Sequence, residues 1–431
     1  MLTAMTAFAL VALAQAPAPS AAPALSPLET VQGFKLLSGP NYKELWREYK
    51  KSSFPAAGWQ YTDGVIKHVD GGGGGDIITT DQYTDFDLQL EFKTGTAANS
   101  GIIYHIAESK DYCWMTGPEF QILEDVGAKE KLDGLHSCAA LYDILGAPAT
   151  KQLKPANEWN SARIFFRNGV VQHWLNGQKV VETRFFDDAG KPSEEWLKKI
   201  AGSKFKQWPG FGLETKGHIA LQEHPGEVSF RNIKVRDLNA KAANEVALFN
   251  GTDTSNWTVV QADAKEKTSP WSVKDGLLIT AGNPIGYLRT TQKHTNFILR
   301  LEWRFSPETK KTGNGGVLVR LVGDDKVWPK SIEAQLNSGT AGDFFSIDGA
   351  KLTGDVKRSK GRHTQRTHTA ERAVGEWNDY EIIVNKGEIT LTINGEEVNK
   401  ATGAEELAGY IALQSEGAEL HFRNVRLIPL K

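Results

Sequence analysis

Cysteine, charge of one dominant sign and long apolar runs are all scarce in this 431-residue chain, and each scarcity excludes a class of protein. Two cysteines are too few for a disulfide framework, and they form no Cys-x-x-Cys metal motif. With 50 basic and 52 acidic residues, the chain has no electrostatic footprint for nucleic acid or an anionic membrane. No apolar run is long enough to span a bilayer. A neutral ligand is therefore expected.

The N-terminus carries the longest apolar stretch, and it is short. Residues 1–16 end in an Ala-x-Ala cleavage pattern, although no Lys or Arg precedes the apolar residues. We expect a signal peptide and export to the periplasm or the extracellular space; the alternative is a disordered start. Residues 17–33, rich in Ala and Pro, are then predicted to be a flexible segment.

The two cysteines, Cys113 and Cys138, flank one stretch of the first half of the chain. In an exported protein they could form a single disulfide that closes this loop. Two free buried thiols are the alternative, because spacing alone does not show that two Cα atoms approach each other.

Glycine and tryptophan are abundant, with 42 and 12 residues, while long amphipathic helical patterns are scarce. Short alternating runs are separated by Asp-Gly and Asn-Gly turns, a pattern typical of antiparallel hairpins. We therefore predict an all-β fold of the β-sandwich or jelly-roll type. The main exception is an insert at 185–217, where residues 193–199 are predicted to form a short helix.

The chain contains the same domain twice. Matching segments recur in the same order in both halves, among them Trp59-x-x-x-Asp63-Gly64 with Trp271-x-x-x-Asp275-Gly276, Glu158-Trp159-Asn160 with Glu376-Trp377-Asn378, and Phe230-Arg231-Asn232 with Phe422-Arg423-Asn424. A repeat of this length indicates two whole domains rather than a solenoid. We predict a first β-sandwich at 34–238, a linker at 239–245 and a second, variant β-sandwich at 246–431 that lacks the insert.

A Glu-x-Gln strand is the most informative part of the repeat. In Glu119-Phe120-Gln121 the two polar side chains share one face of the predicted strand, and Glu333-Ala334-Gln335 repeats the arrangement. A half-buried strand needs one apolar face, but it does not need this polar pair twice. The pair is either surface decoration or part of a site.

Strand parity supplies companions for this pair. If the strands neighbour one another in one sheet, the same polar face collects Gln222, His224 and His105 in the first copy, and Gln414, Glu416 and Arg320 in the second. Carboxylates, carboxamides and arginine suit vicinal hydroxyls, and Trp114, Trp174 or Trp208 could supply an aromatic floor. This indicates a sugar-sized site; the alternative is a set of cross-strand pairs on an exposed sheet.

Several polar residues have competing interpretations. His136 is a further acid/base candidate, while Arg231 and Arg423 either bind substrate or anchor the last strand, and Asn99 is expected in a turn. The basic cluster at 351–372 either binds a phosphate or acidic sugar or is a solvated loop. No Gly-x-Ser-x-Gly or His-Glu-x-x-His motif occurs.

Taken together, these segments resemble the 3-keto-disaccharide hydrolase family, whose fold is a concanavalin A-like lectin/glucanase sandwich. The motifs that carry the resemblance are Gly75-Asp76-Ile77-Ile78-Thr79-Thr80, Asn99-Ser100-Gly101-Ile102, Gly117-Pro118-Glu119-Phe120-Gln121, Ala140-Leu141-Tyr142-Asp143, His173-Trp174-Leu175-Asn176-Gly177 and Leu221-Gln222-Glu223-His224. The resemblance covers 34–238 strongly and 246–431 as a variant that keeps Glu333, Gln335, Gln414 and Arg423.

The resemblance implies an exported enzyme that cleaves a disaccharide or glycoside already oxidised to a ketone at C3. A base would remove the acidified C2 proton, the C1 substituent would leave, and water would add back. The catalytic candidates are Glu119, His224 and His136; the substrate-binding candidates are Gln121, His105, Gln222, Arg231, Trp174, Glu333, Gln335, Gln414 and Arg320.

No cofactor is predicted, although a divalent metal could stabilise the enolate, and the only predicted partner is an oligosaccharide or glycoside. The second copy has Glu416 in place of His224, so it either acts on another linkage or only binds. The alternative for the whole chain is a non-catalytic, lectin-like or cell-wall-associated protein.

Overall fold

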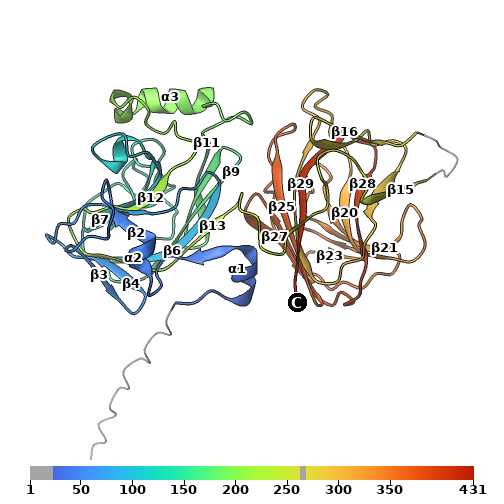
Figure 1. Cartoon of the computed structure of the whole chain (residues 1–431), viewed down its shortest axis with the longest axis horizontal. Helices are drawn as coiled ribbons and strands as arrows, with labels where there is room; N and C mark the ends of the chain where they lie inside the picture. Colours follow the sequence, from blue (N-terminus) through green and yellow to red (C-terminus); the bar gives the residue numbers. More distant parts are fainter. Residues whose placement is uncertain (1–22, 263–267) are drawn as a thin grey trace, which may run out of the picture.

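The structure, a computed structural model, describes residues 23–262 and 268–431. Within these residues the strands form four antiparallel sheets, two in each half of the chain. Figure 1 shows two β-sandwiches side by side, which confirms the all-β prediction. The predicted signal peptide at 1–16 lies outside the described residues. In the described part no helix is long and apolar enough to cross a membrane.

In the first domain, we call the sheet that carries Glu119 the front sheet and the other the back sheet. The front sheet has the order β2 (Trp46–Glu48), β5 (Ile77–Thr79), β12 (His218–Leu221), β7 (Asn99–Ile106), β8 (Glu119–Leu123). The back sheet has the order β11 (Gln178–Arg184), β10 (Val170–Leu175), β9 (Asn160–Arg167), β6 (Phe86–Thr94), β13 (Val228–Asp237), β4 (Val65–His68), β3 (Trp59–Thr62), and β1 (Phe34–Leu36) pairs with β13.

The second domain repeats this arrangement. Its front sheet has the order β15 (Trp257–Gln261), β18 (Gly286–Thr290), β28 (Tyr410–Ser415), β20 (Gly316–Val322), β21 (Lys330–Gln335), β22 (Phe344–Ile347), β24 (His363–Thr364), β23 (Ser359–Lys360). Its back sheet has the order β16 (Trp271–Lys274), β17 (Leu277–Thr280), β29 (Leu420–Pro429), β19 (Phe297–Phe305), β25 (Asn378–Asn385), β26 (Glu388–Ile393), β27 (Glu396–Ala401), and β14 (Val246–Ala247) pairs with β29.

Each sandwich buries its own core between its two sheets, as the alternating patterns require. In the first domain Phe120 of the front sheet and Phe166 of the back sheet belong to one buried cluster. The apolar side chains of β8 therefore pack in the core. The alternate residues, Glu119 and Gln121, lie on the opposite face of the front sheet.

The helical elements are short. The insert after β11 contains α3 (Glu194–Gly202), which confirms the helix predicted there, followed by the 3-10 turn η2 (Lys204–Gln207). A second 3-10 turn, η1 (Cys113–Met115), precedes β8, and α2 (Tyr42–Leu45) precedes β2. The turns η1 and η2 both border the face that carries Glu119.

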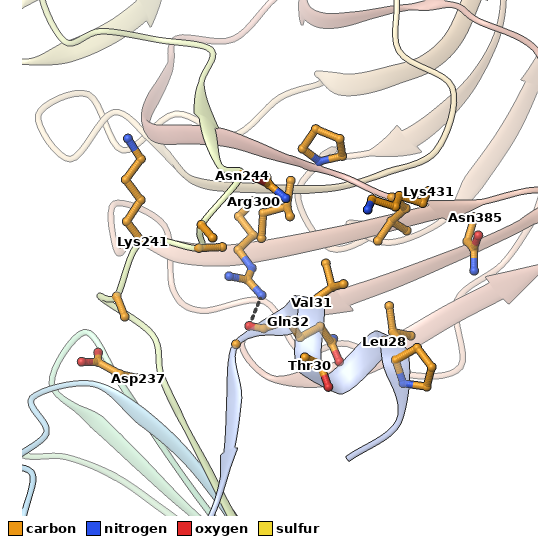
Figure 2. A pocket seen from close by; sticks show the side chains of 18 residues that line it. Leu28, Thr30, Val31, Gln32, Asp237, Lys241, Asn244, Arg300, Asn385 and Lys431 are labelled. Carbon is orange, nitrogen blue, oxygen red and sulfur yellow. Dashed lines mark hydrogen bonds between the residues drawn. The ribbon is translucent and has the colours of Figure 1, made fainter. Parts of the chain in front are cut away.

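Residues 26–33 were predicted to be flexible, and this is wrong. Ser26 and Glu29 form a capping box with Pro27 at the first helical position, which explains why α1 (Pro27–Gln32) forms. Figure 2 shows α1 beside the linker and the C-terminal strand, where Arg300 donates to the Gln32 carbonyl at 2.9 Å. The helix therefore contacts both domains. The junction holds a cavity of about 730 Å³, but no predicted site residue lines it.

The two back sheets face each other (Figure 1), and charged side chains lie between them. Arg167 of β9 is buried and pairs with Glu302 and Asp379 of the second domain, and Arg236 pairs with Glu381 at 2.8 Å. Because buried charges are tolerated when they are paired, this network joins the domains back to back. The two front sheets consequently face away from each other.

The cysteines are two free buried thiols, so the disulfide alternative is wrong. Cys138 belongs to the core cluster between the sheets, whereas Cys113 belongs to a separate cluster that includes Ile103 and Ala220 on the outer face of the front sheet. The sheet itself separates the two sulfur atoms.

Candidate active site

The outer face of the first front sheet brings the Glu-x-Gln pair together with its strand neighbours. Gly101 of β7 is paired with Gln121, and Ile103 is paired with Glu119, so these residues share one face. A Cβ atom at Gly101 would lie 2.3 Å from the Glu119 Oε1 atom. A glycine is therefore required at this position, because the carboxyl group lies directly over the neighbouring strand.

A cavity of about 270 Å³ opens above this face. It contains four of the predicted site residues together with two of the three predicted aromatic residues, and its lining is Asn99, Trp114, Glu119, Gln121, Tyr142, Lys204, Phe205, Gln207, Trp208, Gln222 and His224. Its size suits one small polar ligand rather than an extended chain. Glu119, Gln121, Gln222 and His224 thus lie together around one cavity, as the parity argument predicted.

The aromatic walls come from the two 3-10 turns. Trp114 of η1 and Trp208, directly after η2, meet edge to face with ring centroids 5.4 Å apart. Tyr112 stacks on the side of Trp114 at 5.8 Å and is exposed. The insert at 185–217 therefore acts as a wall of the cavity through Trp208, one of the aromatic residues predicted for the site.

Several polar atoms that border the cavity have no hydrogen-bond partner among the described residues. They are Gln121 Oε1, Asn99 Oδ1, His224 Nδ1 and Trp208 Nε1, and each of these atoms is buried. An unsatisfied buried polar atom costs on the order of 1–3 kcal/mol, so four around one cavity are a strong sign that a ligand satisfies them. Asn99 was expected in a turn and instead lines the site.

The carboxyl group of Glu119 is set up to keep its proton. The side chain is 5% exposed, and burial raises its pKa to about 8; the charge of Asp76 adds to this rise, and the charge of Lys204 opposes it. At neutral pH Glu119 is therefore largely protonated and able to act as a general acid.

The pKa of His224 is shifted in the opposite direction, downward. Burial lowers its pKa below the ordinary 6.5, His68 lowers it further, and Glu223 opposes the change. Its Nε2 atom lies 3.3 Å from the Asn99 amide nitrogen, and its Nδ1 atom is the unpartnered one. Because the Asn99 amide nitrogen is a donor, Nε2 is the accepting nitrogen of the neutral ring and Nδ1 carries its proton, so Nε2 is the atom suited to be a general base.

Lys204 is the cation that borders this cavity, and sequence reasoning missed it. Its ammonium nitrogen lies 4.1 Å from the centroid of the Tyr142 ring, and its backbone N–H donates to Asp143 at 2.8 Å. Tyr142 in turn is fixed beside Glu119, because its N–H donates to the Glu119 carbonyl. The Ala140-Leu141-Tyr142-Asp143 motif was the only available sign of this corner of the site.

His136 lies one residue removed from the cavity. Its ring packs against Tyr142 at 4.7 Å and its Nε2 atom lies 3.1 Å from Asp143. It does not line the cavity, so its contact with the site runs through Tyr142 and Asp143.

The placement of His105 on this face is wrong. His105 adopts a left-handed backbone conformation with φ of 52°, at a β-bulge in the pairing of β7 with β12. The bulge reverses the alternation, so its ring packs into the core, 4.4 Å from Phe166, and it bonds the Thr84 carbonyl. The same bulge recurs at Arg320, with φ of 56°, whose guanidinium donates to the carbonyl groups of Leu407 and Lys386.

The prediction that Trp174 and Arg231 lie close to Glu119 is also wrong, because both residues belong to the back sheet. Trp174 of β10 donates to Gln172 at 3.1 Å, and Arg231 of β13 pairs with Glu91 at 2.7 Å over the Trp159 ring. Neither lines the cavity. Arg231 and Arg423, which pairs with Glu302, anchor the last strand of each domain, as the alternative interpretation held.

In the second domain the corresponding residues Glu333, Gln335 and Gln414 are buried on the outer face of the front sheet. Burial raises the pKa of Glu333 to about 8, with Glu416 adding to the rise. Part of the basic cluster is paired, because Arg366 and His363 pair with Asp343 and His368 pairs with Glu396, whereas Arg362 is exposed.

Within the described residues, a group of three potential metal ligands, Glu308, Glu419 and His421, lies where β29 begins in the second domain. Its atoms are all within 4.8 Å of one another. None of the three lines the Glu119 cavity.

Comparison with known proteins decides the family. The model of the 3-keto-alpha-glucoside-1,2-lyase-like domain matches residues 34–236 and again 244–428. This chain belongs to that family. Membership places it among glycosidase-type proteins, and both domains are concanavalin A-like sandwiches.

Individual relatives match mostly one domain. A 3-keto-disaccharide hydrolase of Bacteroides thetaiotaomicron is 34% identical over 225 residues, which is 45% of this chain and 74% of the relative. The crystal structure of a Parabacteroides distasonis protein classed as a candidate glycosyl hydrolase is 31% identical and covers 50% of this chain and 99% of its own, with a TM-score of 0.44. A Bacillus licheniformis β-glucanase is 10% identical and covers 44% of this chain and 100% of its own, with a TM-score of 0.32.

Proposed function

We propose that the first domain cleaves the glycosidic bond of 3-keto-disaccharides or 3-keto-glycosides. The observation that carries this proposal is the pairing, at one small cavity, of a protonated buried carboxyl group on Glu119 with a neutral imidazole on His224. Elimination from a ketone needs one acid and one base in complementary protonation states. Family membership and the Bacteroides relative support the choice of substrate.

In the proposed reaction His224 takes the C2 proton, which the C3 ketone has acidified. The electron pair forms an enolate, and the positive charge of Lys204 stabilises it together with the amide of Gln222. The enolate then collapses to a C1–C2 double bond while the C1–O bond breaks. Glu119 gives its proton to the departing oxygen, so the leaving group departs as an alcohol or a sugar.

Water completes the net hydrolysis. Its oxygen bonds C1 of the unsaturated ketone, its proton goes to the Glu119 carboxylate, and His224 returns a proton to C2. The aromatic walls of Trp114 and Trp208 flank the sugar during these steps, and Gln121 Oε1 and Asn99 Oδ1 accept bonds from its hydroxyl groups.

This mechanism differs from ordinary glycoside hydrolysis, which uses two carboxylates at a defined separation. Solvent deuterium distinguishes the two. Elimination and hydration in D₂O place deuterium at C2 of the product, and direct displacement does not.

The direct test is incubation of the purified chain with α- and β-linked 3-keto-glucosides while the release of the aglycone is followed. Release with deuterium at C2 is expected. The absence of turnover with every substrate would leave the second candidate, a lectin-like or cell-wall-associated protein, as the function of the chain.

We also propose that the protein is exported, on the basis of the Ala-x-Ala pattern at the end of residues 1–16. N-terminal sequencing of the protein recovered from a periplasmic or culture fraction tests this. A chain that retains Met1 and stays in the cytosol contradicts it.

A further inference from the structure

The outer face of the second front sheet has kept the residues that surround Glu119. Gly316 pairs with Gln335, Leu318 pairs with Glu333, and Tyr287 pairs with Gln414, so these side chains share one face. A Cβ atom at Gly316 would lie 2.2 Å from Gln414 Oε1 and 2.7 Å from Glu333 Oε1. The carboxyl and amide groups therefore converge above this glycine.

The Gln414 amide is only partly satisfied within the described part of the chain. The side chain is 2% exposed and contacts the Glu333 carboxyl group, and its Oε1 and Nε2 atoms have no other hydrogen-bond partner. A primary amide offers one acceptor oxygen and two donor hydrogens, which match a pair of neighbouring hydroxyl groups. One bond to Glu333 leaves the remaining amide atoms unsatisfied, and the cost of burying them indicates that a ligand occupies this position.

A cation approaches the same place in both domains, and it comes from unrelated segments. In the first domain Lys204 lies over Tyr142, the neighbour of Glu119. In the second, the guanidinium of Arg362 lies 5.6 Å from the ring centroid of Phe345, which pairs with Glu333.

Lys204 belongs to the insert that the second copy lacks, whereas Arg362 belongs to the turn between β23 and β24. Inheritance of one duplicated sequence therefore does not explain the recurrence. A ligand that needs a positive charge beside the carboxyl group does explain it.

The second site lacks two features of the first. Glu416 stands where His224 supplies an imidazole. The sequence of the second copy has no counterpart of the 185–217 insert, and Trp328, five residues before Glu333 as Trp114 is five before Glu119, is 44% exposed. Gln335 also differs from Gln121, because its Oε1 accepts the Leu336 N–H at 3.2 Å. The second site therefore lacks the counterpart of His224, and the neighbouring His363, which stacks on Phe345, is paired with Asp343.

We propose that the second domain is a binding site for the same sugar unit, which it holds without cleaving. Glu333, Gln414 and Arg362 recognise the sugar, whereas the second domain does not retain the histidine that removes the C2 proton in the first. The existence of this site rests on the buried, incompletely satisfied Gln414 amide, which converges with Glu333, and on the recurrent cation, whereas the identity of its ligand rests on the function proposed for the first domain.

Isothermal titration calorimetry of the full chain carrying Glu119→Gln, with methyl 3-keto-glucoside as the probe, tests this. Two binding sites per chain are expected. Adding Gln414→Leu, which preserves the side-chain shape, should leave one site, and adding the exposed change Glu397→Gln should leave two. A single site in the parent, or two sites after Gln414→Leu, overturns the proposal.

Arg362→Gln is a second variant that does not disturb the core, because Arg362 is exposed. It should weaken one of the two binding events roughly ten-fold, as expected for loss of a charge-assisted hydrogen bond. Equal affinities at both sites before and after this change contradict the proposal.

The two proposals fail in distinguishable ways. Two binding sites with no turnover by the unmodified chain would overturn the first and support the second. Turnover by the unmodified chain together with a single binding site would do the reverse. The absence of any binding heat and any turnover would overturn both.

Discussion

The two domains share one front sheet and differ in what covers it. In both, the Glu-x-Gln strand pairs with a strand that has a glycine under the glutamate side chain. In both, the pKa of the glutamate rises to about 8 because the carboxyl group is buried. Within the described residues, the first adds the walls of Trp114 and Trp208 and the ring of His224, whereas the second has Glu416 in place of His224. The comparison teaches that the sheet carries recognition, and that residues added at its rim decide whether chemistry follows.

The cation sharpens this comparison. Lys204 and Arg362 reach equivalent rings from segments that are not copies of each other. A positive charge that arose separately in each domain is stronger evidence for a role in ligand binding than a charge that the duplication copied. The four predictions below test this contrast, from the largest expected effect to the smallest.

Glu119→Gln should lower kcat on a 3-keto-glucoside by roughly 10²–10⁴-fold, because the leaving oxygen loses its proton donor. Steady-state kinetics measure this, and Glu194→Gln on the exposed face of α3 is the control. Residual turnover above about one part in a hundred would show that the second domain also cleaves, since the general-acid contribution sets that floor.

His224→Gln should lower turnover by about 10²-fold and slow the entry of deuterium at C2 to the same extent, because the base is lost. NMR of the product in D₂O measures the exchange. His224→Glu copies the residue of the second domain and should be equally impaired. Undiminished entry of deuterium at C2 in the His224→Glu variant would remove the reason for treating the second domain as non-catalytic.

Lys204→Gln should lower kcat by about ten-fold, less than for a buried donor, because Lys204 is exposed and water screens its charge. Since Lys204 lowers the pKa of Glu119, its removal should also move the alkaline limb of the pH–rate profile upward from about 8. The exposed Lys206→Gln variant should leave both quantities unchanged. An unshifted limb with normal kcat would show that Lys204 has no electrostatic role.

Glu119→Gln and Glu333→Gln should each raise Tm at alkaline pH. The folded pKa of each glutamate, about 8, exceeds the ordinary 4.5, so the folded state keeps a proton that the unfolded state has released. Native stability therefore falls as pH rises from 4.5 to 8 and is flat beyond.

The gap in Tm between each variant and the unmodified chain should open across this window, by roughly 2–4 °C for each kcal/mol gained. Scanning calorimetry at pH 5 and pH 9 measures it. A gap of equal size at both pH values would contradict the assignment of a buried, protonated carboxyl group.

Local patterns in the sequence determined a large part of the fold. The alternation in strands such as β8, the Asn-Gly turns and the duplicated segments are properties of neighbouring residues, and they predicted two all-β domains and the polar pair of Glu119 and Gln121. The capping box that forms α1 was equally local, and it was missed because the surrounding Ala/Pro composition dominated the interpretation.

The tertiary structure alone decided which residues share the site. Parity tells on which face of a strand a side chain lies, but not to which sheet the strand belongs, so Trp174 and Arg231 were placed with Glu119 although they lie in the back sheet. One left-handed residue at a bulge sent His105 into the core. Lys204 reaches the cavity only because the insert folds across the sheet. The pKa of Glu119 is likewise not a property of its neighbours in the chain, because it arises from burial among residues that the fold brings together from distant segments.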